Sequence, residues 1–185
     1  MAWQLDTNHT QVAFTAKHMM ISTVRGQFKQ FSGTLDLDEQ TPASSKIDVT
    51  IDAASLDSGS EQRDGHVRSA DFLDVEHYPT ITFKSTKVEQ LSQDDFSITG
   101  DLTIRGVSRP VVLAATRDGE TNDPWGNRRV GFSLTTSINR KDWGLNWNVA
   151  LEAGGVLVSE KVTISIDGQV FEPAQVPAEA GAASV

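Results

Sequence analysis

Residues 96–110 read FSITGDLTIRGVSRP, and this stretch decides the fold class. From position 96 to position 104 the apolar residues all stand at even positions: Phe96, Ile98, Leu102 and Ile104. The odd positions between them carry Ser, Thr or Asp. Such a period of two puts the apolar groups on one face of a strand and leaves the other face to water, as in antiparallel sheets. The segment RGVSRP (105–110) then predicts a hairpin turn into the next strand. The stretch therefore predicts an antiparallel strand pair with one dry face.

The same alternation recurs along most of the chain. It is seen in QVAFTAKH (11–18), KIDVTIDA (46–53), TITFKST (80–86), RVGFSLTTSIN (129–139) and KVTISIDGQV (161–170). LSQDD (91–95) predicts a second hairpin turn, and RDGETNDPWGNRR (117–129) predicts a longer polar link. About eight strands in meander order follow. Because no helical period separates them, a parallel sheet is disfavoured.

One strand is expected to bend. In VRGQFKQFSGTLDLD (24–38), Val24 and Phe28 share one parity, whereas Phe31 and Leu35 have the other. A β-bulge or corner between Phe28 and Phe31 would return both sets to one face. Eight one-sided antiparallel strands can form either a sandwich or an up-and-down barrel, and alternation alone does not choose between them.

Length and composition exclude several classes of function. The 185 residues suit one domain, predicted as residues 1–171, with a flexible tail at 172–185 that is rich in small residues and proline. The net charge of −9 argues against nucleic acid as a partner, because phosphate binding requires clustered Lys and Arg. No apolar run approaches the roughly 20 residues that cross a bilayer, so stable membrane insertion is not expected.

The absence of cysteine excludes disulfides and thiolate chemistry. As written, the sequence begins without a basic segment and apolar run of a signal peptide. We therefore expect a cytoplasmic protein, or a periplasmic one if a leader has been removed.

Residues 58–78 form a charged insert, most of which lies in RDGHVRSADFLDVEHYP (63–79), and Pro79 begins the next strand. Ser58 and Glu61 have capping-box spacing, and Asp64 with Arg68 has the spacing of an ion pair on a helix. On one continuous helix, His66 and His77 would lie about 16 Å apart, which is too far for one metal ion. We expect neither a metal site nor a catalytic residue here, since no GxSxG elbow, P-loop or HExxH spacing occurs.

A third cluster is NRKDWGLNWN (139–148), in which Trp143, Leu145 and Trp147 alternate. These three side chains are predicted to share one face, at the mouth of a barrel or as an aromatic cap on its core. The two interpretations do not exclude each other.

Taken together, these segments resemble the YceI-like family of polyisoprenoid-binding, lipocalin-like proteins. The run RDxH…DFxDVxxYPxITFxS (63–85) carries most of the resemblance, and the matching pieces extend from Trp3 to about Phe171. The resemblance implies an all-β, eight-stranded antiparallel lipocalin-like β-barrel whose helix-containing crossover insert spans about 58–78. It also implies a bacterial protein, a homodimer, and an apolar tunnel that binds, sequesters or transports an isoprenoid chain, an isoprenoid quinone or another long-chain amphiphile. No cofactor other than that ligand is expected.

The predicted ligand site has a wall and a mouth. The wall consists of apolar side chains of the buried parity: Val12, Phe14, Phe28, Phe31, Val49, Ile51, Phe83, Ile98, Leu102, Phe132 and Leu134. The mouth consists of cationic and aromatic residues: His18, Arg63, His66, Arg68, Phe72, Arg140, Trp143, Leu145 and Trp147. An eight-stranded barrel is just wide enough to fill itself with side chains or to hold one slender ligand. Two alternatives stay open: an enzyme acting on a lipid-like substrate through His9, His18 and His66, and a ligand-free structural dimer.

Overall fold

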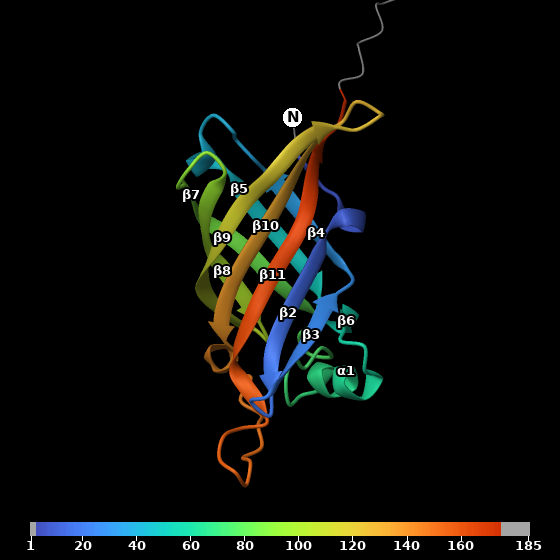
Figure 1. Ribbon diagram of the computed structural model, residues 1–185, viewed down its shortest axis with the longest axis vertical. Helices are drawn as coiled ribbons and strands as arrows, with labels where there is room; N and C mark the ends of the chain where they lie inside the picture. Colours follow the sequence, from blue (N-terminus) through green and yellow to red (C-terminus); the bar gives the residue numbers. More distant parts are fainter. Residues whose placement is uncertain (1–2, 175–185) are drawn as a thin grey trace, which may run out of the picture.

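The structure is a computed structural model that describes residues 3–174 (Figure 1). Within that range there are eleven β-strands: β1 (Gln4–Leu5), β2 (Gln11–His18), β3 (Ser22–Phe28), β4 (Phe31–Asp36), β5 (Lys46–Asp52), β6 (Leu56–Asp57), β7 (Thr80–Gln90), β8 (Asp95–Ile104), β9 (Val107–Asn122), β10 (Arg128–Asn139) and β11 (Val158–Glu172). The one α-helix of these residues is α1 (Glu61–Arg68). Four short 3-10 turns are η1 (Thr7–His9), η2 (Pro42–Ser44), η3 (Ala53–Ser55) and η4 (Arg140–Trp143).

The strands pair antiparallel in the order β4-β5-β7-β8-β9-β10-β11-β2-β3-β6, and β1 also pairs with β11. β7, β8, β9, β10 and β11 pair in sequence, and β11 pairs with both β2 and β1. Ile164 of β11 lies opposite Phe14 of β2, and Val170 lies opposite Leu5 of β1. The sheet therefore closes on itself, and the sandwich alternative is excluded.

The predicted bend lies at Lys29 and Gln30, between β3 and β4. Phe28 is paired with Leu56 of β6, and Phe31 with Ile51 of β5. Backbone hydrogen bonds bridge the corner: Lys29 N donates to Ser55 O at 3.1 Å, and Asp52 N donates to Gln30 O at 2.9 Å. The corner thus turns the strand without ending its pairing.

The number of times that the chain crosses the length of the barrel agrees with the eight strands expected from the sequence. β1 with β2, β3 with β4, and β5 with β6 are consecutive pieces of single chain passes, interrupted by η1, the corner and η3. An isolated antiparallel bridge between Trp3 and Leu35 joins the first pass to the second at one end. The eleven strands of residues 3–174 therefore form an eight-stranded, up-and-down antiparallel barrel, as predicted.

The two ends of the barrel differ. The upper end in Figure 1 carries the β4–β5, β7–β8 and β9–β10 connections, and the lower end carries the β2–β3 and β8–β9 connections with α1 beside them. At the upper end a small core of Trp3, Leu35 and Val170 packs inside the sheet. Arg128 binds Glu39 at 2.6 Å above this core. Packing and an ion pair therefore narrow the upper end.

The predicted polar link at 117–129 is wrong in its extent. β9 continues to Asn122, β10 begins at Arg128, and Thr121 pairs with Arg129. These residues are polar because the strands project beyond the core, where cross-strand ion pairs stabilise them: Arg128 reaches Glu120 at 3.0 Å. Only residues 123–127 form the turn.

Asp123 holds that turn together. Its carboxylate accepts hydrogen bonds from Trp125 N at 3.0 Å and Asn127 N at 2.9 Å, and from Arg129 Nε at 2.8 Å. Burial would raise the pKa of Asp123, but these hydrogen bonds, foremost the one from Arg129, lower it to about 2.

The C-terminal boundary shifts by one residue. β11 includes Glu172, which the sequence analysis assigned to the tail, because Glu172 pairs with Arg128 of β10. Ala174 N still donates to Asn127 Oδ1 at 3.1 Å. The rest of the predicted tail, residues 175–185, lies outside the described residues.

The insert folds as predicted in outline, but its capping differs. Ser60, not Ser58, is the N-cap of α1, and its hydroxyl accepts from Arg63 N at 3.4 Å. Asp64 is 3 % exposed and accepts a hydrogen bond from Ser58 N, so it does not pair with Arg68. The predicted capping box and Asp64–Arg68 pair are therefore wrong, because Asp64 turns inward to anchor the start of the insert.

Candidate functional site

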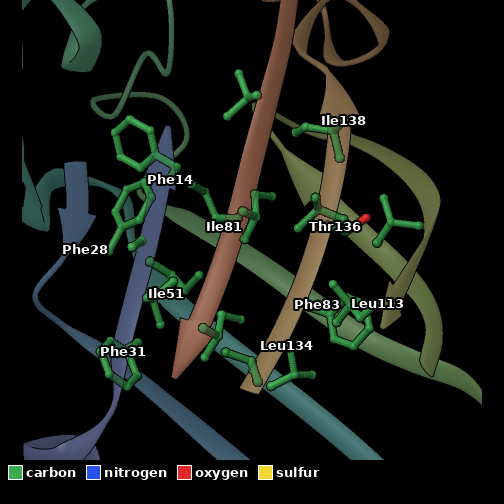
Figure 2. Close-up of a pocket in the computed structure, with 18 of the residues that line it drawn as sticks. Phe14, Phe28, Phe31, Ile51, Ile81, Phe83, Leu113, Leu134, Thr136 and Ile138 are labelled. Carbon is green, nitrogen blue, oxygen red and sulfur yellow. The ribbon is translucent and has the colours of Figure 1, made fainter. Parts of the chain in front are cut away.

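A cavity of about 1320 Å³ lies inside the barrel. Figure 2 shows side chains from several strands that point into it, and the labelled ones are apolar except for one. They are Phe14, Phe28, Phe31, Ile51, Ile81, Phe83, Leu113, Leu134, Thr136 and Ile138. The cavity is thus bounded by hydrocarbon and aromatic rings from around the sheet.

The cavity exists because the inward side chains do not meet at the centre. Phe14, Leu134 and Ile138 point inward and are only partly buried, since their inner surfaces border the cavity. Gly26 makes room beside one of them, because a Cβ at this position would collide with the Phe14 ring. β10 spans 12 residues, which at about 3.3 Å each and a tilt near 40° corresponds to roughly 30 Å along the barrel axis. The space is therefore long and narrow.

All eleven wall residues predicted from alternation line this cavity. Others of the same parity were not proposed, among them Ile81, Leu113 and Ile138. Leu113 belongs to β9, where Val111 and Leu113 face inward and Val112 is 55 % exposed. That alternation was present in PVVLA (110–114) and could have been found, had the preceding turn been recognised as ending at Gly106.

The lower mouth is built by the aromatic cluster that the sequence singled out. Trp143 is 3 % exposed, and its Nε1 donates to Leu102 O at 2.9 Å, which fixes the 140–157 connection against β8. Trp147 lies beside the insert, with its ring centroid 4.5 Å from that of His66 and 5.4 Å from that of Phe72. Leu145, which stands between the two tryptophans in the sequence, is buried. All five residues line the cavity, so the cluster both caps the core and forms the mouth.

Arg140 is a buried cation at this mouth. It is 4 % exposed, and its guanidinium donates to Leu145 O at 2.6 Å, Ser159 O at 2.9 Å and Val158 O at 3.3 Å. Burial lowers the pKa of Arg140, and no carboxylate of residues 3–174 forms an ion pair with it. A guanidinium has five N–H donors, so two remain beyond these three bonds. Such a group can donate to a phosphate, carboxylate or carbonyl oxygen.

Some of the residues predicted at the mouth line the cavity, and one does not. His18 and Arg63 line the cavity, and Arg63 is held by Ser58, whose hydroxyl accepts from Nε at 2.7 Å. Arg68 does not line it: Nε donates to Ala54 O at 3.0 Å and a terminal nitrogen donates to Leu56 O at 2.6 Å. The assignment of Arg68 to the mouth is therefore corrected, because its guanidinium ties α1 to the end of the β5–β6 pass.

The histidines do not assemble into one site. His9 hydrogen-bonds to Asp6 at 2.8 Å, and all of β2, about 26 Å of strand, separates it from His18. His66 hydrogen-bonds to Asp71 at 2.9 Å. His77 does so with Asp74 at 2.9 Å, and this hydrogen bond and the nearby charge of Asp74 raise the pKa of His77. His9 thus lies at the upper end of the barrel, whereas His18 and His66 lie at the lower end. The three histidines of the enzyme alternative therefore do not form one site.

Within residues 3–174, no three His, Cys, Asp or Glu side chains converge as they would to hold a metal ion. Among the same residues, the helices lack the length and apolar character that a membrane-spanning helix requires. That the protein has no metal and no catalytic residue stays a prediction.

Comparison with protein families gives one match that covers almost the whole chain. The family model of the YceI-like domain matches residues 3–170. Protein YceI of Escherichia coli O17:K52:H18 is 42% identical over 160 residues, which cover 86% of this chain and 81% of that protein. A UPF0312 protein of Azotobacter vinelandii is 45% identical over 137 residues, covering 74% and 71%.

Solved structures show the same architecture. The YCEI protein of Campylobacter jejuni superimposes with a TM-score of 0.73 at 33% identity, covering 84% of this chain and 89% of that chain. A polyisoprenoid binding domain from Saccharophagus degradans gives a TM-score of 0.65 at 17% identity, covering 94% and 99%. At that lower identity the likeness concerns the fold alone.

Proposed function

Since this chain belongs to the YceI-like family, we propose that its barrel binds one long-chain isoprenoid, or an amphiphile of similar shape, with the chain inside the cavity. The observation that carries the proposal is the volume of about 1320 Å³ behind a mostly apolar wall. Ordinary small-molecule pockets measure about 300–1000 Å³, so this one has room for a longer ligand. The name of the Saccharophagus degradans domain, which has the same fold, supports the same class of ligand.

The wall supplies enough free energy for such binding. Each methylene transferred from water into an apolar environment contributes about 0.8 kcal/mol. A chain of several isoprene units therefore gains more than the cost of losing its translational and rotational freedom, without any charged contact. Selectivity for length and branching would come from the aromatic side chains that narrow the cavity, such as the Phe14–Phe28 pair, whose centroids lie 5.7 Å apart.

The polar head of the ligand is assigned to the lower mouth. Arg63, His66 and Arg140 line the cavity there, and none of the three is ion-paired except His66 with Asp71. At the upper end, by contrast, Glu39 on the cavity rim is already bound by Arg128 at 2.6 Å. An oxygen-rich head, such as a phosphate, carboxylate or quinone carbonyl, would thus find at the lower mouth two guanidinium groups, Arg63 and Arg140, that no carboxylate of the described residues binds.

Native mass spectrometry of freshly purified full-length protein tests the proposal. We expect an additional mass that disappears on extraction with organic solvent and that is identified in the extract as a long-chain amphiphile. If repeated preparations show the bare polypeptide mass alone, and the protein takes up no geranylgeraniol when offered it, the barrel is not a lipid container.

The position of the head is tested separately with Arg63→Gln. We expect this variant to lose about tenfold in affinity for an isoprenoid phosphate and to bind the corresponding alcohol as before, because a charge-assisted hydrogen bond is lost. Lys84→Gln is the control, since it removes the same unit of charge from an exposed residue of β7 away from the cavity. Equal loss of phosphate affinity in both variants would contradict the assignment.

The pairing of two copies and the cellular compartment stay predictions. Whether the ligand is carried, stored or sensed depends on how it is loaded and released, which the next feature of the molecule bears on.

A further inference from the structure

Three consecutive apolar residues form the tip of the β2–β3 hairpin, at the barrel's lower end. Met19, Met20 and Ile21 connect β2 to β3, and they are 42 %, 64 % and 82 % exposed. Hairpin turns of this kind usually carry Asn, Asp or Gly, which suit both the backbone and the solvent. Here the exposed side chains are hydrocarbon and thioether groups. The turn lies at the lower end of the barrel, beside the β10–β11 connection, which extends further down (Figure 1).

The backbone of this turn is unfavourable for the residues it carries. Ile21 N donates to His18 O at 3.2 Å, and both central residues have positive φ, 51° at Met19 and 61° at Met20. This is the left-handed region, which non-glycine residues adopt at a cost in conformational energy. Strain of this sort is retained where the side chains serve a purpose other than folding. The two methionines are therefore explained better by what they contact outside the protein than by the turn.

The tip belongs to a larger apolar surface. Met19 N donates to Leu157 O at 2.8 Å, which fastens the turn to the 140–157 connection. Gly155 leaves space for the Met20 sulfur, since a Cβ at Gly155 would collide with it. Val149 of the same connection is 47 % exposed. We call Met19, Met20, Ile21 and Val149 the tip patch.

Charge does not by itself decide which end of the barrel would meet a bilayer. The three upper connections, residues 37–45, 91–94 and 123–127, contain four acidic residues (Asp38, Glu39, Asp94, Asp123) and no Lys or Arg. The three connections around the tip patch, residues 19–21, 105–106 and 140–157, contain three cations (Arg105, Arg140, Lys141) and two acids (Asp142, Glu152), a net charge of +1. The insert (residues 58–79) lies at the same end and carries a charge of −3, so the lower connections, at +1 without it, together carry −2. At the upper end, Glu39 and Asp123 are paired with Arg128 and Arg129. Anionic headgroups are therefore not required for the tip to meet a bilayer.

We propose that the tip patch docks on the surface of a lipid bilayer, with its apolar side chains inserted shallowly at the level of the headgroups. Methionine suits this contact because its flexible, polarisable side chain adapts to irregular apolar surroundings. Docking would turn the lower mouth toward the membrane, because His18, which precedes the tip directly, lines the cavity. The docking does not depend on which ligand the barrel holds. The insert beside the tip is acidic, with two Arg and five Asp or Glu over residues 58–79, so apolar contact supplies the attraction.

Vesicle flotation of the full-length protein tests the docking. We expect binding to phosphatidylcholine vesicles, since insertion is apolar, and about a tenfold lower partition coefficient for Ile21→Ser, because one exposed aliphatic side chain is lost from the contact. Leu91→Ser is the matched control: Leu91 is 69 % exposed in the β7–β8 connection at the upper end. The control should bind within twofold of the unaltered protein.

A second variant separates docking from folding. The double substitution Met19→Asn with Met20→Gly places favoured residues at both positive-φ positions. It should therefore unfold at a higher temperature than the unaltered protein and still float with vesicles about tenfold less. A loss of binding in this more stable variant has no explanation in misfolding.

Three results would overturn the proposal. The first is no binding of the unaltered protein to phosphatidylcholine vesicles, with or without phosphatidylglycerol. The second is equal loss of binding in the Leu91→Ser control. The third is unchanged vesicle binding in Ile21→Ser while sedimentation equilibrium shows a dimer dissociating, which would make the patch a contact between copies of the chain. Uptake of geranylgeraniol, measured on the same variants, should stay unchanged, so failure of docking and failure of the proposed function are distinguishable.

Discussion

Thr136→Phe probes whether the barrel interior is open. Thr136 lies on β10, and its side chain points into the cavity among Leu134 and Ile138 (Figure 2). In a filled core, the added ring would overpack its neighbours and destabilise the protein by about 1–3 kcal/mol. In an open cavity the ring has space, so we expect the free energy of unfolding to change by less than about 1 kcal/mol.

Ligand binding should respond in the opposite way. The introduced ring would occupy the space of roughly four methylene groups of the ligand chain, and each contributes about 0.8 kcal/mol. The expected loss is about 3 kcal/mol, or on the order of a hundredfold in affinity. The two effects together, little change in stability and a large loss of binding, are the signature of an open channel.

Urea unfolding measures the first quantity, and a titration with geranylgeraniol followed by Trp fluorescence measures the second. Thr135→Phe is the control, because Thr135 is the neighbouring residue on the exposed face of β10. The argument is refuted if Thr136→Phe lowers the free energy of unfolding as overpacking does, or if it binds the ligand as tightly as the control.

Two further predictions concern stability. Because the pKa of Asp123 is about 2 in the folded protein and 3.8 in the unfolded chain, its stabilising contribution is complete above pH 3.8 and is lost as the pH falls toward 2; urea unfolding at pH 5 and pH 2.5 should show a smaller acid loss in Asp123→Asn, and equal losses would contradict this. Trp143→Phe removes the hydrogen bond to Leu102 O and should cost about 1–3 kcal/mol, seen as a Tm several degrees lower, whereas Trp125→Phe, at a ring 77 % exposed, should leave Tm unchanged.

Much of the wall was predictable because alternation is a local property. A residue such as Leu102 faces inward as a consequence of the pleat, whatever the neighbouring strands do. Its burial at 7 % followed from the pattern, whereas the cavity that it borders did not. The bend at Phe28–Phe31 was predictable for the same reason, since the change of parity is visible in the sequence.

The mouth was less predictable, since its residues come from separate connections. Arg63 and Arg68 have the same type and lie five positions apart on α1, yet only Arg63 reaches the cavity. What separates them is the position of the β5–β6 pass, whose carbonyls at Ala54 and Leu56 bind Arg68. Nothing in the local sequence of α1 carries that information.

The sequence by itself determined that the sheet is antiparallel, which side of each strand is dry, where the charged insert interrupts the strands, and which family the chain resembles. Only the tertiary structure decided that the sheet closes through β11, β1 and β2, that a long cavity remains at its centre, and that apolar residues gather at one tip. The physical reason is that alternation is set by neighbouring residues along one strand. Closure and internal volume depend instead on the stagger of all the strands together, and on side chains that meet only across the barrel.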